Sequence, residues 1–392
     1  MTVSMRPTRA IVIVMDSVGA GSLPDAGAYG DEGSDTLGNI HALVPLRVPT
    51  LRRLGLGHVA NIGPPTASPT GAFGRMAERS AGKDSVTGHW EMAGVVLDRA
   101  FPTFPDGFPP ELMASFERRI GRATLGNIVA SGTAVIDALG PEHMRTGAPI
   151  VYTSADSVFQ IAAHEAVIPI EEQYRICHEA YELIVRGLGV GRVIARPFVG
   201  EPGRFVRTPN RRDFAIEPHQ RTLLDTLTAA GHTVVAIGKI EDLFAGRGVT
   251  RAVHTTSDDD GMRVIAEEMD RQPAGLLFAN LVDFDAQFGH RNDPRGYAAN
   301  LERFDECLGS LCARLGPGDI LVVTADHGND PTTPSTDHSR EYVPLLVSGV
   351  AVRPGVDLGT RATFADLGQT LAELFGVERL PAGTSFLPEV LR

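Results

Sequence analysis

The sequence contains little cysteine, and its N-terminus has no long apolar run. Its 392 residues include only 3 Cys, at positions 177, 307 and 312, and no two of them form a CxxC pair. We therefore expect no disulfide framework, a reducing cytoplasmic location, and thiols that act as small core residues. The apolar run at residues 11–15 is far shorter than a signal sequence core or a membrane span of about 20 residues. Neither export nor membrane insertion is expected.

Basic residues are also in short supply. The chain has 36 Lys and Arg against 48 Asp and Glu, a formal net charge of -12. The overall field therefore favours neither nucleic acid nor an anionic membrane as a partner. The exception is the segment 192–212, which contains six arginines and only one acidic residue, Glu201. This segment is either a solvated loop or a binding site for a small anionic substrate.

Short apolar runs rich in Val and Ile recur along the chain without polar alternation. They lie at residues 10–15, 232–237, 276–281, 320–324 and 343–347. Strands that are buried on both faces have this pattern. Apolar residues at helical spacing lie between or after these runs, as at 301–315 and 364–374, with Gly316 and Gly376 as expected helix stops. We predict an α/β fold with a doubly wound, mostly parallel sheet and helices on both sides.

The middle of the chain has a different character. Residues 101–111 are rich in proline and residues 210–220 are polar, as at crossings between domains. Between them lie two strand patterns and one helical pattern, at residues 150–153, 193–195 and 171–186. We predict a smaller α/β cap domain, residues 101–217, inserted into a core of residues 1–100 and 218–392.

Asp and His residues follow three of the predicted strands. Ligands gather beyond the carboxyl ends of strands in doubly wound sheets, so side chains placed there are expected to converge. The residues concerned are Asp16, Asp285, His290, Asp326, His327 and His338. A lone Asp-His pair can equally be a helix cap or a polar loop, but this convergence favours a metal site. Imidazole with carboxylate suits Zn, Mn or Fe, and two such ions would serve phosphoryl transfer.

A nucleophile for such a transfer can be sought in the segment AGKDSVTGHWEMAG, residues 81–94. It places Ser85 and Thr87 among glycines, where a hydroxyl can approach metal ions closely. Bound cations would make the alkoxide accessible near neutral pH, so we expect its activation to need no neighbouring base. Such hydroxyls often only stabilise a turn, and composition does not choose between the two.

Long motifs throughout the chain resemble those of the phosphopentomutase family, within the alkaline phosphatase superfamily. They include MDSVGAG (15–21), GKDSVTGHWE (82–91), YTSADSVFQIAAHE (152–165), RVIARPFVG (192–200), NLVDFDAQFGHRND (280–293) and TADHGNDPTTPSTDHSREYVP (324–344). The similarity runs nearly from end to end. It implies an alkaline-phosphatase-like core with an inserted cap.

The resemblance also implies a role for particular residues. Two Mn²⁺ ions would be held, one by Asp285, His290 and His338 and the other by Asp16, Asp326 and His327. Thr87, which precedes Gly88 as the family's phosphothreonine does, would lie between the ions. The sugar phosphate would contact Ser154, Asp156, Arg192, Ile194 and Lys239.

The family interconverts α-D-ribose 1-phosphate and D-ribose 5-phosphate, and the 2-deoxyribose phosphates, in nucleotide salvage. The resemblance therefore implies small sugar phosphates as partners, a monomer, and glucose 1,6-bisphosphate or a pentose bisphosphate as primer. The cap would act as a lid that shields the phosphoenzyme from water. Arg192 and Arg196 lie on one face of a predicted strand, where a guanidinium can bind the phosphate that is not transferred. Arg196 could equally pair with a carboxylate.

Two other interpretations compete with this one. A cofactor-independent phosphoglycerate mutase or an alkaline phosphatase shares the metal pattern, but the threonine in KDSVTGHWE argues against both. A non-catalytic protein that binds sugar phosphate or Mn²⁺ would keep the site without turnover. The presence of every ligand and of the hydroxyl argues against that interpretation.

Overall fold

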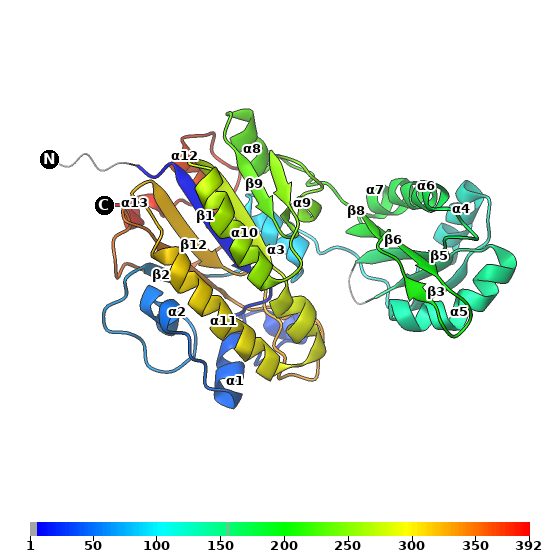
Figure 1. Ribbon diagram of the computed structural model, residues 1–392, viewed down its shortest axis with the longest axis horizontal. Helices are drawn as coiled ribbons and strands as arrows, with labels where there is room; N and C mark the ends of the chain where they lie inside the picture. The colour runs from blue at the N-terminus through cyan, green and yellow to red at the C-terminus, as the bar shows by residue number, and fades with distance from the viewer. Residues whose placement is uncertain (1–5, 155–156) are drawn as a thin grey trace. The chain divides into compact units, whose positions relative to one another are not determined.

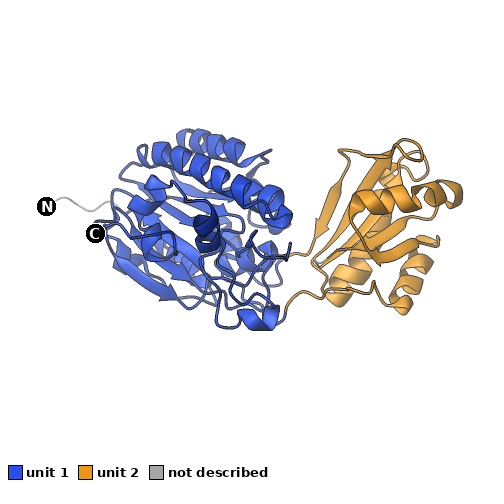
Figure 2. Cartoon of the chain, turned by 90° about the horizontal axis from the view of Figure 1, so that it is seen from below, with its two compact units in different colours: residues 1–99, 218–392 blue, residues 100–217 orange. Residues whose placement is uncertain are grey.

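The computed structural model describes residues 6–154 and 157–392 (Figure 1). The chain forms two compact units, one of Met1–Arg99 with Pro218–Arg392 and one of Ala100–Glu217 (Figure 2). We call the first the core unit and the second the cap unit. The chain thus leaves the core unit once and returns to it once, and each unit is described by itself.

The core unit is built on an eight-stranded sheet with the order β10-β9-β11-β1-β12-β13-β2-β14. The first five strands in this order are mutually parallel: β10 (Arg251–Val253), β9 (Val234–Ile237), β11 (Gly275–Leu281), β1 (Arg9–Met15) and β12 (Asp319–Thr324). Strand β13 (Val343–Ser348) is antiparallel to both neighbours, and β2 (Ala72–Met76) pairs in parallel with β14 (Asp357–Arg361). The predicted mostly parallel sheet is confirmed.

The three central strands owe their position to unbroken apolar sequence. Every residue of β1, β11 and β12 is buried, as expected of strands covered on both faces. Met15 pairs with Leu281, and Val14 pairs with both Asn280 and Thr324. Because the strands are parallel and in register, the loops that follow them start side by side at one edge of the sheet.

Helices cover both faces of the core sheet, as the sequence predicts. In Figure 1, α10 (Asp258–Arg271) and α11 (Pro294–Cys312) cross the face toward the viewer. Residues of α3 (Ser85–Met92), α8 (Leu223–Ala229) and α12 (Ala365–Phe375) meet the other face around Val12 and Phe278. The other α-helices described in this unit are α1 (Thr36–Leu43), α2 (Pro49–Leu54), α9 (Ile240–Leu243) and α13 (Leu387–Val390).

The ends of two core helices test the expected glycine stops. Helix α12 ends at Phe375 and is followed by Gly376, whose φ of 67° is the left-handed conformation that glycine adopts most readily. Helix α11 begins at Pro294, seven residues before the predicted 301, and ends at Cys312, before Gly316. The predicted start was late because it was based on apolar periodicity alone. The true start is marked by Asp293, which caps the helix, and by Pro294 at the first helical position.

The cap unit contains a mixed six-stranded sheet. Its order is β3 (Leu125–Val129), β4 (Ile150–Thr153), β5 (Val158–His164), β6 (Arg192–Val199) and β7 (Val206–Arg207), and β8 (Arg212–Ala215) also pairs with β6. Strands β3 and β4 are parallel, as are β5 and β6, and the other pairs are antiparallel. The short predicted strand 193–195 is thus part of a longer one.

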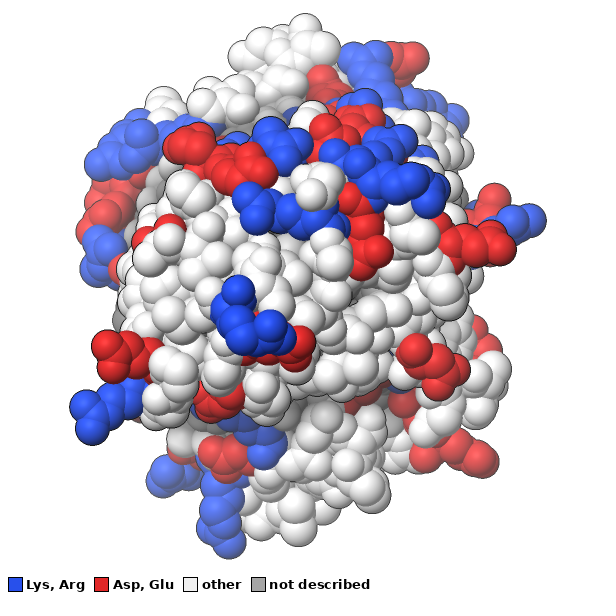
Figure 3. Space-filling view, turned by 90° about the vertical axis from the view of Figure 1, so that its right-hand side faces the viewer, with Lys and Arg blue, Asp and Glu red and all other residues white. Residues whose placement is uncertain are grey.

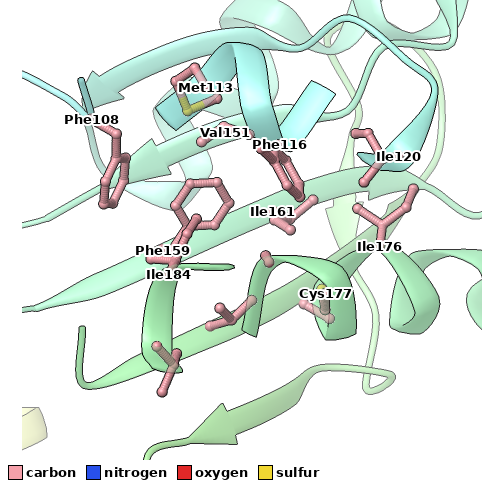
Figure 4. Close-up of a cluster of buried hydrophobic side chains, with 14 of the residues drawn as sticks. Phe108, Met113, Phe116, Ile120, Val151, Phe159, Ile161, Ile176, Cys177 and Ile184 are labelled. Atoms are coloured by element: carbon pink, nitrogen blue, oxygen red, sulfur yellow. The ribbon is translucent and has the colours of Figure 1, made fainter. Parts of the chain in front are cut away.

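Two apolar clusters hold the cap helices to this sheet. Figure 4 shows one cluster, in which Phe116 of α4 (Pro110–Ile120) packs near Phe159 of β5, with Ile176 and Cys177 of α6 (Ile170–Ala180) in the same cluster. The other cluster joins α5 (Gly132–Thr146) to the opposite face through residues such as Tyr152. Each face of the cap sheet is therefore covered by helix over part of its area.

The predicted helix 171–186 is not continuous. Helix α6 ends at Ala180, a π-helical turn occupies Tyr181–Val185, and α7 (Arg186–Leu188) follows. Residue periodicity did not reveal this change, because a π turn shifts the apolar face by a single residue. Cys177 is buried as expected, whereas Cys307 and Cys312 on α11 are only partly buried.

Charged side chains of both signs are interspersed on the face drawn in Figure 3, with a broad area of uncharged residues between them. This agrees with ion pairs such as Arg175 with Glu172 on α6. Over residues 6–154 and 157–392, no helix is both long enough and apolar enough to span a bilayer.

Candidate metal centre

The loops after the central strands bring the six predicted ligands together. Asp16 directly follows β1, and Asp326 lies two residues after β12. Asp285 belongs to a π-helical turn at Phe284–Phe288, and His290 to the 3-10 turn that comes next. His338 precedes Ser339, which pairs with Gly328 in an isolated β-bridge. That bridge draws the His338 loop back beside His327.

The first group of potential ligands consists of Asp16, Asp326 and His327. His327 Nε2 lies 3.3 Å from Asp16 Oδ1 and 3.4 Å from Asp326 Oδ2. All three side chains are buried, and one ligand atom from each lies within 4.8 Å of the others. This is the geometry of a small site that a single cation can occupy.

The second group is centred on Asp285. His290 Nε2 lies 3.0 Å from Asp285 Oδ2, and His338 Nε2 lies 3.4 Å from Asp285 Oδ1. The rings of His327 and His338 stack with their centroids 3.9 Å apart. One ligand atom from each of Asp285, His327 and His338 also lies within 4.8 Å of the others, so His327 borders both groups. The division of the six residues between two ions stays a prediction.

Unpartnered polar atoms show that these residues fit a cation. Asp16 Oδ1, Asp326 Oδ2 and His338 Nε2 are buried without a hydrogen-bond partner among the residues that the structure describes. Leaving a buried polar atom without a hydrogen bond is costly, and a metal ion would satisfy all three atoms. The mixture of nitrogen and oxygen ligands suits Mn, Zn or Fe.

The charges of the cluster support the same conclusion. Burial opposes ionisation of Asp285, but the nearby His338 and His290 outweigh it and hold the pKa of Asp285 well below its usual range. Burial likewise opposes protonation of His327, but Asp326 and Asp16 outweigh it and raise the pKa of His327 well above its usual range. The buried carboxylates are therefore stabilised in their ionised form by nearby positive charge, and a divalent cation can supply such charge.

Two asparagines and one lysine complete the surroundings of the carboxylates. Asn280 Nδ2 donates to Asp16 Oδ2 at 3.2 Å, and Asn329 Nδ2 donates to Asp285 Oδ1 at 2.9 Å. Lys239 Nζ, expected at the substrate, lies 3.6 Å from Asp16 Oδ2. Neither asparagine was predicted from the sequence. The signal for Asn280 was a polar residue inside the apolar run 276–281.

Ser85 and Thr87 lie in the first turn of helix α3, and we call residues 81–88, which include this turn, the hydroxyl loop. Asp84 caps this helix, and its Oδ1 accepts hydrogen bonds from the backbone N–H groups of Val86 and Thr87. Its Oδ2 accepts the Thr87 hydroxyl at 2.5 Å, so a carboxylate that was not anticipated from the sequence lies beside this hydroxyl. An acidic N-cap three residues before Thr87 was the signal that could have found it. Ser85 Oγ lies 3.2 Å from His327 Nε2.

Further contacts tie the hydroxyl loop to the loop that carries His338. The buried Arg340 side chain donates to Ser80 O at 2.8 Å and to Gly82 O at 2.6 Å. Lys83 Nζ lies 3.0 Å from Asp31 Oδ2, and that carboxylate oxygen also accepts the Arg340 backbone N–H. A side chain on one loop therefore holds the backbone of the other.

The remaining predicted residues belong to the cap unit. Ser154 follows β4, and Arg192 and Ile194 lie on one face of β6, opposite the apolar cluster of Val193 and Ala195. Arg192 Nη1 is 4.0 Å from Asp213 Oδ2. Asp156 lies outside the described residues.

Comparison with known proteins places this fold and cluster in a defined class. A sequence model of the metalloenzyme superfamily matches residues 8–379. Phosphopentomutases of Caldanaerobacter subterraneus and Desulfitobacterium hafniense are 55% and 58% identical to this chain over 97% and 98% of its length, and 98% and 100% of theirs. The chain belongs to the phosphopentomutase family, whose name is that of a mutase, an isomerase. This confirms the resemblance found in the sequence.

Solved structures of low sequence identity share the fold. A protein from Pyrococcus horikoshii aligns with a TM-score of 0.52 and 16% identity over 96% of this chain and 100% of that one. Phosphoglycerate mutase of Leishmania mexicana aligns with a TM-score of 0.50 and 14% identity over 98% of each chain. These two structures therefore share the overall fold of this chain.

Proposed function

We propose that the chain interconverts α-D-ribose 1-phosphate and D-ribose 5-phosphate, and the corresponding 2-deoxyribose phosphates, with the phosphoryl group carried on Thr87. The observation that carries this proposal is the 55–58% identity, over nearly the whole chain, to relatives named phosphopentomutase. The convergence of six Asp and His residues beside the hydroxyl loop supports it. Nucleotide salvage in the cytoplasm is the setting we infer.

We further propose that the six ligands hold two Mn²⁺ ions, with Asp285, His290 and His338 at one and Asp16, Asp326 and His327 at the other. The nitrogen and oxygen donors and the unpartnered buried atoms support a divalent metal. When bound, such ions would supply positive charge for the attacking and leaving oxygens of a phosphoryl transfer.

The protein's own side chains prepare the nucleophile. Asp84 holds the Thr87 hydroxyl in one orientation through the 2.5 Å hydrogen bond and can accept its proton. Lys239, next to Asp16, brings a positive charge that can contact an anionic phosphoryl oxygen. Arg340 keeps the backbone before Thr87 in place through Ser80 O and Gly82 O.

The cap unit would supply substrate specificity and exclude water. We propose that Ser154, Asp156, Arg192 and Ile194 contact the sugar phosphate, together with Lys239 from the core unit. A mutase must keep its phosphoryl group from hydrolysis, and a closing unit serves that purpose. Glucose 1,6-bisphosphate or a pentose bisphosphate would phosphorylate the enzyme before its first turnover.

A coupled assay tests the reaction. Conversion of ribose 1-phosphate to ribose 5-phosphate is measured with and without Mn²⁺ and glucose 1,6-bisphosphate, and release of inorganic phosphate is measured in parallel. We expect isomerisation that needs both additions, with little phosphate released. Phosphate release without isomerisation would indicate a phosphatase, and activity on phosphoglycerate alone would indicate the competing mutase. Binding without any turnover would indicate a non-catalytic protein.

The phosphorylated residue is tested by a pair of variants in one loop. Thr87→Ala should abolish mutase activity and leave metal content intact, whereas Ser85→Ala should reduce activity only modestly. Peptide mass spectrometry after treatment with glucose 1,6-bisphosphate should locate phosphate on Thr87. Ser85 is the matched control because its hydroxyl also lies beside the metal cluster, with Oγ 3.2 Å from His327 Nε2. Phosphate on Ser85, or on neither residue of an active protein, would overturn the assignment.

A further inference from the structure

The backbone directly after Asp16 turns sharply at a residue that is not glycine. The N–H of Val18 donates to Met15 O at 3.1 Å, which closes a four-residue turn at the end of β1. Ser17 occupies the third position of this turn with a φ of 74°. A positive φ at this position favours glycine, because any side chain there is strained. The serine therefore has a conformational cost, which its contacts can offset.

The turn brings the Ser17 backbone into contact with the metal cluster. Its N–H donates to Asp326 Oδ1 at 3.0 Å. The other oxygen, Asp326 Oδ2, lies 3.4 Å from His327 Nε2 and 3.2 Å from His89 Nδ1. One oxygen of this carboxylate is therefore held by the backbone, while the other borders the first group of potential ligands. The residue after Asp16 thus orients a second ligand of the same group.

The Ser17 side chain is held in turn by helix α11. Ser17 Oγ lies 3.1 Å from Tyr297 Oη, and both residues are completely buried. Over the described ranges 6–154 and 157–392, this is the one hydrogen bond that either hydroxyl makes. The two hydroxyls satisfy each other, and removing either one would leave the other buried without a partner.

Tyr297 also lies beside the second group of potential ligands. Its ring centroid is 5.6 Å from that of Phe284, the residue before Asp285. Burial raises the pKa of Tyr297 well above its usual range, the Ser17 hydroxyl opposes that rise, and nearby carboxylates, among them Asp285 and Asp16, add to it. The phenol is therefore neutral. One side chain of α11 thus meets the segments that carry ligands of both groups.

We propose that Ser17 and Tyr297 are positioning residues for the metal centre, because their hydroxyls hold the turn after Asp16 in the conformation in which its N–H fixes Asp326. The left-handed conformation directs the N–H, and the hydroxyl pair offsets its cost. Residues that hold metal ligands in place typically change metal affinity about 10–100-fold when they are replaced. The proposal rests on the divalent metal site of the proposed function and adds two residues to which that function assigns no role.

Titration with Mn²⁺, followed by the electron paramagnetic resonance signal of the free ion, tests the pair in the full-length protein. Ser17→Ala and Tyr297→Phe should each weaken at least one Mn²⁺ site at least about tenfold. The double variant should lose no more affinity than the more affected single variant, because both changes break the same hydrogen bond. Losses that add would show that the hydroxyls act separately. That result, or wild-type Mn²⁺ affinity in both single variants, would overturn the proposal.

A glycine variant separates positioning from a structural role. Ser17→Gly combined with Tyr297→Phe removes both hydroxyls and gives the turn the residue that suits its φ. In EDTA, the melting temperature should be unchanged or higher, because no hydroxyl is left unpaired. Mn²⁺ should nevertheless bind at least about tenfold more weakly. A lower melting temperature with wild-type Mn²⁺ affinity would show that the pair serves only the fold, which contradicts the proposal.

Ala245→Gly is the matched control for the change of backbone. Ala245 follows α9 in the core unit and is another non-glycine residue with a positive φ, of 51°. Its replacement should leave Mn²⁺ affinity unchanged, and an affinity loss equal to that of the Ser17 variants would overturn the proposal. Wild-type protein that binds neither Mn²⁺, Zn²⁺ nor Co²⁺ would overturn the proposed function as well. Metal binding by the wild type with unaffected variants would overturn this proposal alone.

Discussion

Gly88 lies in helix α3, where this helix contacts Asp326, one of the six potential metal ligands. A Cβ at this position would overlap the backbone carbonyl oxygen of Asp326 and lie 2.9 Å from its carbonyl carbon. The sequence led us to expect that this glycine gives metal ions room to approach. The structure shows a different contact, with the backbone of a potential ligand. Gly88→Ala should therefore displace Asp326, or helix α3 with Thr87.

The size of this displacement follows from contact distances. Carbon atoms normally approach to about 3.5–4.0 Å, so the new methyl group, 2.9 Å from the carbonyl carbon, requires a shift of about 0.6 to 1.1 Å. Helix propensity alone favours alanine by about 1 kcal/mol, whereas overpacking a tight site costs about 1–3 kcal/mol. We expect a net loss of stability. A misplacement of about 1 Å can reduce turnover about 100-fold.

Three measurements check this expectation: bound metal by elemental analysis, the melting temperature with Mn²⁺ and with EDTA, and kcat in the coupled assay. The control is Gly187→Ala on α7, where a Cβ would meet nothing within 4 Å. Gly88→Ala should lose metal and turnover, and the control should lose neither. Wild-type metal content and kcat in Gly88→Ala would refute the reasoning.

Three further predictions follow from other sites. Asp326→Ala and His338→Ala should lose bound metal and activity together, whereas His178→Ala on α6 should lose neither, and full metal content in Asp326→Ala would contradict the ligand assignment. Arg192→Ala should raise KM for the sugar phosphate and raise hydrolysis relative to transfer, because an unanchored phosphate leaves the phosphoenzyme open to water; unchanged kinetics would disprove that role. Burial raises the pKa of Asp258 from 3.8 to about 7, so its stabilising contribution is complete below pH 3.8 and is lost as the pH rises through 7. Relative to Asp258→Asn, the unfolding free energy of the wild type should fall by about 2–3 kcal/mol between pH 5 and 8, and a constant difference in denaturant titrations would contradict the shift.

Much of the fold could be predicted because the pattern of apolar residues along the chain reflects which faces of each element are buried. The apolar runs at β1, β11 and β12 are continuous, and this is possible only where both faces of a strand are covered. Parallel strands end at one edge, so Asp and His residues placed after them had to converge. Prediction was less successful where periodicity changed, as at the π-helical turn that follows α6.

The sequence by itself therefore determined the class of fold, the six-residue cluster and the family. Only the tertiary structure decided which atoms meet. Asn280 and Asp16 are 264 positions apart, and the side chain of Arg340 reaches Ser80 across 260 positions. The physical reason is that hydrophobic periodicity records which face of an element is buried, whereas a hydrogen bond between distant residues depends on strand register and on the path of each loop.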